Sequence, residues 1–147
     1  MEKITIALAS DHAGWERKQT VMQHLNKLEI PYKDFGAFSD QSTDYADWAH
    51  PMSEAVENGE FTFGITLCGS GNGINMTANK HQKIRSALCW IPEIAALARQ
   101  HNDANVLSLP ARFITDQLAI EIVDAFLNAD FEGGRHLTRI NKIPLSK

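Results

Sequence analysis

The fold of this chain is decided by the stretch Phe61-Thr-Phe-Gly-Ile-Thr-Leu-Cys-Gly-Ser-Gly-Asn-Gly73. Its apolar first part, residues 61–67, is typical of a strand buried inside a sheet. The three glycines at alternate positions after it allow a sharp turn, and a short helix is predicted from there to Lys80. A buried strand, a glycine-rich loop and a helix in this order indicate an α/β protein.

The same alternation continues on both sides of this stretch. Four further strands are predicted at residues 4–9, 32–35, 84–90 and 105–109, and helices with apolar stripes at 21–28, 48–56, 91–98 and 118–126. The last segment, 131–147, is basic and is predicted to be partly helical. Fully apolar strands that alternate with helices predict a five-stranded parallel sheet covered on both faces. No linker is visible, so residues 1–147 are expected to form one domain.

Composition narrows the classes of protein that fit. The chain has 147 residues, 44% of them hydrophobic, which supports a core and argues against disorder. The net charge of −4 argues against a nucleic-acid partner. No apolar run approaches membrane length, and the N-terminus does not resemble a signal peptide. The two cysteines without a CxxC motif favour a reducing, cytoplasmic location, and no metal-ligand spacing is present.

Ligands of parallel sheets bind outside the carboxyl ends of the strands, and this rule selects the loops 10–14, 36–47, 68–73, 90–92 and 110–115. In the third of these, Cys68 precedes a helix N-terminus, where a thiol is expected to have a lowered pKa and to serve as a nucleophile or a general base. A buried structural thiol is the alternative. The glycines predict a cradle for an oxyanion or phosphate or, less specifically, an ordinary turn. A P-loop is excluded because no Gly-Lys-Ser/Thr sequence follows.

Other polar residues follow the predicted strands or lie near the C-terminus. Asp11 and His12 suit proton transfer or anion binding, or else a cap on the next helix. Arg112 follows the fifth strand, where a guanidinium reaches a ligand. Arg135 and Arg139, four residues apart, share one face if that segment is helical and then grip one phosphate together; a solvated basic tail is the alternative.

Taken together, these residues resemble the family of ribose-5-phosphate isomerase type B, which also contains the galactose-6-phosphate isomerase subunits. The resemblance is collinear over nearly the whole chain. It rests on Ser10-Asp-His-Ala-Gly14, Thr43-Asp-Tyr45, Cys68-Gly-Ser-Gly-Asn-Gly73, Ala78-Asn-Lys80, Arg99-Gln-His-Asn-Asp-Ala-Asn-Val-Leu107 and Gly133-Gly-Arg-His136. One branch of the family uses a Glu base directly after the last glycine of the loop; Ile74 stands there, so the sequence resembles the cysteine branch.

The resemblance implies a three-layer α/β/α Rossmann-like sandwich. It implies an isomerase that interconverts ribose 5-phosphate and ribulose 5-phosphate through an enediolate, in the pentose phosphate pathway, without a metal or organic cofactor. It also implies a homodimer, or a dimer of dimers, whose active sites are shared between subunits. The segment 131–147 is then expected to pack on a partner subunit or reach into it.

The resemblance also implies a role for each site residue. Cys68 is the base that moves a proton between C2 and C1. Ser70 and the amides of Gly69, Gly71, Asn72 and Gly73 stabilise the enediolate. His101 assists ring opening and Asp11 handles substrate hydroxyls. Tyr45 and Asn102 line the sugar. The phosphate is held by His12, Arg112, Arg135 and Arg139.

The sequence departs from the family pattern at Ala46, Met76, Pro110 and Trp90-Ile-Pro92. These residues concern the walls of the pocket, so they leave the length and stereochemistry of the sugar open. One alternative is therefore a hexose 6-phosphate isomerase of the galactose or allose type. A second is a sugar-phosphate-binding regulatory module without turnover, and a third is a redox-sensing thiol protein. The regulatory module and the redox sensor fit the sequence less well. Binding alone does not need Cys68, and a redox sensor would need a second cysteine nearby.

Overall fold

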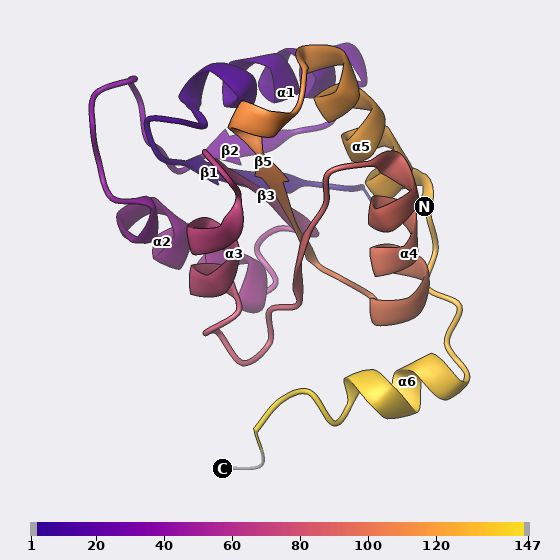
Figure 1. Cartoon of the computed structure of the whole chain (residues 1–147). Helices are drawn as coiled ribbons and strands as arrows, with labels where there is room; N and C mark the ends of the chain where they lie inside the picture. Colours follow the sequence, from indigo (N-terminus) through magenta and orange to yellow (C-terminus); the bar gives the residue numbers. More distant parts are fainter. Residues whose placement is uncertain (1–2, 146–147) are drawn as a thin grey trace.

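A computed structural model describes residues 3–145 of the chain (Figure 1). The outermost residues of the predicted domain and of its basic tail, 1–2 and 146–147, lie outside the described residues. Five parallel strands form one sheet in the order β2-β1-β3-β5-β4. They are β1 (Ile6–Ser10), β2 (Tyr32–Asp34), β3 (Phe63–Cys68), β4 (Ser86–Leu88) and β5 (Val106–Pro110). The predicted five-stranded parallel sheet is confirmed.

Helices cover both faces of this sheet, as Figure 1 shows. One face carries α1 (Trp15–Lys27), α4 (Pro92–Asn102) and α5 (Asp116–Asn128), and the other carries α2 (Tyr45–Glu57) and α3 (Asn72–Ala78). A single 3₁₀ turn, η1 (Ala111–Phe113), follows β5, and α6 (Arg135–Ile140) packs on α4 beyond the sheet. The predicted three-layer α/β/α sandwich is confirmed.

The two faces of β1 show why the layers lie as they do. Successive side chains of a strand point to opposite faces, so Ile6 and Leu8 enter the large core under α1, α4 and α5, whereas Ala7 and Ala9 face α2. The small alanines let α2 approach the sheet closely. On β3, a Cβ added to Gly64 would lie 2.6 Å from the sulfur of Met52, which belongs to α2. Close packing of α2 therefore depends on small residues in the strands beneath it.

The chain changes direction across the sheet between β1 and β3, because β1 leads to β2 on one side and β3 leads toward β4 on the other. Such a switch point leaves a crevice outside the carboxyl ends of the two strands. The loops that follow β1 and β3 meet there: the Asp11 backbone N–H donates to the Leu67 carbonyl (3.3 Å). The fold thus brings residues 11–14 and 69–73 to one place.

Several element boundaries differ from the prediction. Only residues 86–88 of the predicted strand 84–90 pair with β5. Helix α2 already begins at Tyr45, within the stretch 36–47 expected to be a loop. Ile91 precedes α4 in an extended conformation, because Pro92 takes the first helical position. Among the described residues, no helix has both the length and the hydrophobicity needed to cross a membrane.

Candidate active site

Cys68 is the last residue of β3, and its side chain is only 3% exposed, packed with Ala49 and Ile74 between α2 and α3. Burial raises the pKa of the Cys68 thiol. The backbone N–H groups of Ile74, Gly71 and Gly73 bond to the sulfur and oppose this effect, while the Asp11 carboxylate adds to it. The lowered pKa expected from the sequence is therefore wrong, because desolvation outweighs the amides at the start of α3.

The loop after Cys68 owes its shape to two glycines. Gly71 has φ +79°, a left-handed conformation that L side chains rarely adopt, and Leu88 leaves no space for a Cβ there. Gly73 lies directly against the ring of Tyr45, which would collide with any added Cβ. The loop therefore turns its N–H groups inward to the sulfur, and Tyr45 closes over it from the first turn of α2.

Ser70 is exposed on the rim of this loop. Its hydroxyl accepts a weak hydrogen bond from the Asn72 backbone N–H (3.3 Å). Asn72 is exposed as well. Both side chains are thus accessible to a molecule that approaches the loop from solvent, in contrast to the buried sulfur.

Asp11 and His12, directly after β1, are oriented by backbone groups. The Asp11 carboxylate is buried and accepts a hydrogen bond from the Gly14 N–H (3.1 Å). Gly14 is itself the N-cap of α1 and no side chain caps that helix, so the capping alternative is wrong. The Nδ1 atom of His12 lies 3.2 Å from the backbone N and 3.3 Å from the backbone O of Thr43. This contact occupies Nδ1 and leaves Nε2 available to a ligand.

A pocket of about 310 Å³ opens beside the glycine loop. It is lined by His12, Ala13, Glu16, Arg17, Asp40, Ala111 and Arg112. The Arg112 side chain lies over Gly69, and its backbone N–H donates to the Gly69 carbonyl (3.0 Å). Arg17 is engaged by Asp116 (2.6 Å) and by the Ala111 carbonyl (3.1 Å). Within residues 3–145 the Arg112 guanidinium has no ion pair, so it is the cation that this pocket offers to an anion.

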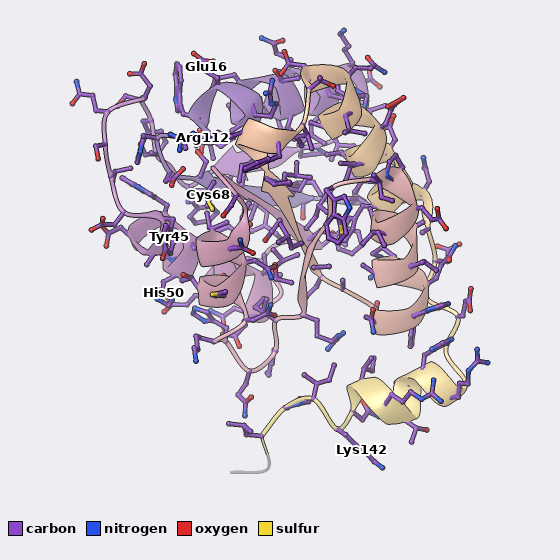
Figure 2. The ribbon with its side chains drawn as sticks, in the orientation of Figure 1. Glu16, Tyr45, His50, Cys68, Arg112 and Lys142 are labelled. Carbon is purple, nitrogen blue, oxygen red and sulfur yellow. The ribbon has the colours of Figure 1, made fainter. Side chains whose placement is uncertain are left out.

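Figure 2 shows these groups along one edge of the molecule, with Cys68 between Arg112 and Tyr45 and Glu16 farther out. The Arg112 side chain lies over Gly69, the residue that follows Cys68, and Tyr45 packs on Gly73. A base, a set of inward amides, a histidine and a free guanidinium are therefore neighbours at the carboxyl ends of β1, β3 and β5.

The remaining predicted residues lie elsewhere. His101 and Asn102 end α4, just before β5 starts, and so they lie at the amino end of the sheet. Arg135 and Arg139 belong to α6, which Figure 1 shows at the far end of the molecule from β3's carboxyl end. Both arginines are exposed. A single chain does not bring these four residues to Cys68.

Three groups were not identified from the sequence: the Ile74 N–H near Cys68, and the side chains of Glu132 and His136 near His101. The Ile74 N–H bonds to the sulfur, and its signal was its place in the first turn of the short helix after Gly73. Glu132 and His136 lie beside His101, and no signal pointed to this because the contact joins segments distant along the chain. In the described part of the chain, His101, Glu132 and His136 are the only group of three His, Cys, Asp or Glu side chains whose donor atoms all lie within 4.8 Å of one another.

Comparison with known proteins agrees with this geometry. The sequence model of the family described as Ribose/Galactose Isomerase matches residues 6–143. A protein of Escherichia coli K12 named ribose-5-phosphate isomerase B is 43% identical over 138 residues, which cover 94% of this chain and 93% of that protein. These values far exceed what a shared fold alone would give.

Solved structures give the same result. The ribose 5-phosphate isomerase of Thermotoga maritima is 46% identical and superposes with a TM-score of 0.95 over 97% of this chain and 99% of that chain. Ribose-5-phosphate isomerase B from Mycoplasma genitalium, solved with bound ribulose-5-phosphate, is 43% identical with a TM-score of 0.91, covering 97% and 95% of the two chains. The chain belongs to the Ribose/Galactose Isomerase family.

Proposed function

We propose that this protein interconverts ribose 5-phosphate and ribulose 5-phosphate, with Cys68 as the general base. The thiolate takes the proton from C2 of the open-chain aldose, and the negative charge moves to the carbonyl oxygen to give an enediolate. The hydroxyl proton on O2 moves to O1, which shifts the negative charge to O2. The thiol then returns a proton to C1, which yields the ketose. The step is a proton transfer within one substrate and needs no oxidant or metal.

The observation that carries this proposal is the convergence of three backbone N–H groups on the Cys68 sulfur, beside the pocket that holds His12 and Arg112. Amides that stabilise a thiolate also stabilise an oxyanion close to it. A phosphate bound between His12 and Arg112 fixes one end of the sugar, which holds the reacting carbons C1 and C2 in place relative to the base. The relative solved with ribulose-5-phosphate supports this choice of substrate.

The resting base is a neutral thiol, because burial raises the pKa of Cys68. The active form is the thiolate, which becomes more abundant as the pH rises toward that raised pKa. We therefore expect activity to increase from neutral to alkaline pH. Because burial also raises the pKa of Cys89 to about 12, that second thiol does not titrate in the same range.

The second half of the site is supplied by another copy of the chain in this proposal. His101, Asn102, Arg135 and Arg139 lie at the end of the molecule opposite Cys68, so only a partner subunit can bring them there. In the described residues neither arginine has an ion pair. A homodimer with shared active sites uses these groups, with the segment after residue 131 reaching the partner. A cytoplasmic location agrees with two free thiols.

A substrate panel on the purified chain tests this function. We expect ribose 5-phosphate to be converted to ribulose 5-phosphate, with deuterium entering C2 of the aldose in D₂O. Faster conversion of galactose or allose 6-phosphate would assign the protein to the hexose branch instead. Binding of the sugar phosphate without turnover or deuterium uptake would indicate a regulatory module.

A further inference from the structure

A compact cluster of two histidines and one acid lies where α6 packs on α4. The rings of His101 and His136 are stacked, with centroids 4.3 Å apart and planes at 10°. Glu132 Oε1 lies 3.8 Å from His101 Nε2 and 3.6 Å from His136 Nε2. The backbone N–H of Glu132 donates to the Gln100 carbonyl (2.9 Å), so this carboxylate is fixed beside the end of α4.

The two stacked rings differ in exposure. The His136 side chain is 8% exposed and the His101 side chain 40%. The Nε2 atom of His136 is buried without a hydrogen-bond partner. Burial lowers the pKa of His136, positive charge on His101, Arg135 and Arg139 lowers it further, and Glu132 opposes them. His101 is the more exposed ring of the two, and its Nε2 lies beside the Glu132 carboxylate.

This arrangement does not suit a metal ion. A metal binds the nitrogen lone pair in the plane of each imidazole, at about 2.0–2.1 Å for zinc. Two nearly parallel rings direct their lone pairs along parallel lines, which do not converge on one ion. Arg135 and Arg139 add positive charge around the cluster. The cluster therefore has the geometry of one imidazole ring supporting the other, rather than that of a metal-binding site.

We propose that His136 and Glu132 are positioning residues that hold His101 for opening the furanose ring of the aldose. This inference rests on the proposed function. In the ring-opening step, the bond between C1 and the ring oxygen breaks and its electron pair goes to the ring oxygen. That oxygen takes a proton from His101, and the C1 hydroxyl gives its proton to water. His136 holds the His101 ring from one face, and the Glu132 carboxylate beside Nε2 orients that ring.

The two substrates differ in their need for this step. Ribose 5-phosphate is mostly a closed furanose, whereas ribulose 5-phosphate is open, since its C5 hydroxyl is blocked by phosphate. Exchange of a C1 hydrogen of ribulose 5-phosphate with solvent requires only the base and the enediolate. Net isomerisation of ribose 5-phosphate also requires the closed furanose to open. A defect in ring opening therefore separates exchange from net turnover.

The experiment measures both rates in D₂O for three variants. We expect His136→Leu and Glu132→Gln to lower net isomerisation by about 10- to 100-fold while deuterium uptake into C1 of ribulose 5-phosphate stays within about threefold of wild type. His136→Phe should keep most of the net activity, because it retains an aromatic face and the buried Nε2 makes no hydrogen bond. His24→Leu is the matched control, since it removes a partly buried histidine paired with Asp124, outside the cluster.

Each other outcome overturns the proposal. An equal loss of exchange and net turnover in the variants would give His136 and Glu132 a structural or chemical role instead. Unchanged net turnover would give them none, and a His136→Phe variant as poor as His136→Leu would exclude support by stacking. Glu132 is exposed, so Glu132→Gln is expected to fold even if a His136 variant does not. A wild-type protein with neither activity would refute the proposed function itself.

Discussion

The two ends of the sheet differ in how completely one chain builds them. At the carboxyl end, Cys68 is 3% exposed and Asp11 is 7% exposed, and backbone groups hold both. At the amino end, His101 is 40% exposed in its side chain, and Arg135 and Arg139 project from a short exposed helix. The first region is preorganised for proton transfer. The second offers cations without a ligand, which is what a shared site requires of each subunit.

The largest effect is expected from the carboxyl end. Cys68→Ala removes the proposed base and should lower kcat by roughly 10²–10⁴, the usual contribution of a general base. Steady-state kinetics with ribose 5-phosphate measures this loss. Cys89→Ala is the control, because Cys89 is also fully buried but lies at the end of β4; it should keep kcat. Retained activity in Cys68→Ala would remove this sulfur from the mechanism.

A substitution at the amino end of the sheet should lower activity less than Cys68→Ala, and mainly through KM. Arg135→Ala removes one proposed phosphate contact, which we expect to lower kcat/KM by about 10- to 100-fold, since charged hydrogen bonds contribute about 1.5–3 kcal/mol. The loss should fall mainly on KM, because the phosphate is bound alike in the ground and transition states. The same loss with a non-phosphorylated sugar would contradict the contact.

Mixing these two variants tests whether the two ends meet across subunits. Refolded together, Cys68→Ala and Arg135→Ala chains form mixed dimers in which one of the two sites has both native residues. Activity should then return to about a quarter of wild type. Cys68→Ala mixed with Ser70→Ala should show no such rescue, because both residues lie on one loop. Failure of the first mixture to recover would mean that Arg135 does not act in the active site of a partner subunit.

The sequence predicted the sheet well and the site only in part. Apolar runs identified β1, β3 and β5, because central parallel strands are buried on both faces. The edge strands β2 and β4 were also identified, although they are less buried. The residues at strand ends, Asp11, His12, Cys68 and Arg112, met as predicted, since topology alone brings strand ends together. The pKa of Cys68 was mispredicted, because its burial depends on Ala49 and other residues distant in sequence. The His101–His136 stack was missed for the same reason.

A third change concerns the rim of the glycine loop. Ser70→Ala should lower kcat only about three- to tenfold, because the N–H groups of Gly71, Gly73 and Ile74 remain in place. Kinetics on ribose 5-phosphate measures the effect, and Ser39→Ala, on an exposed loop after β2, serves as the control. A loss as large as that of Cys68→Ala would show that the hydroxyl, rather than the amides, stabilises the enediolate.

The smallest effect concerns the link between the two strand-end loops. The Asp11 carboxylate raises the pKa of Cys68 by charge repulsion, and Asp11→Asn removes that charge while its amide oxygen still accepts from the Gly14 N–H. The pKa of Cys68 then falls, so the thiolate forms at lower pH. We expect the rise of kcat/KM with pH to move to lower pH, whatever the change in absolute rate.

Asp40→Asn provides the comparison, because Asp40 is an acid of the outer pocket and does not contribute to the raised pKa of Cys68. Its pH profile should keep the midpoint of the wild type. The ultraviolet absorbance of the thiolate gives an independent titration of Cys68, since Cys89 stays protonated until about pH 12. A midpoint that moves to higher pH in Asp11→Asn would mean that the carboxylate assists loss of the thiol proton, and the buried sulfur would then share its role as base with Asp11.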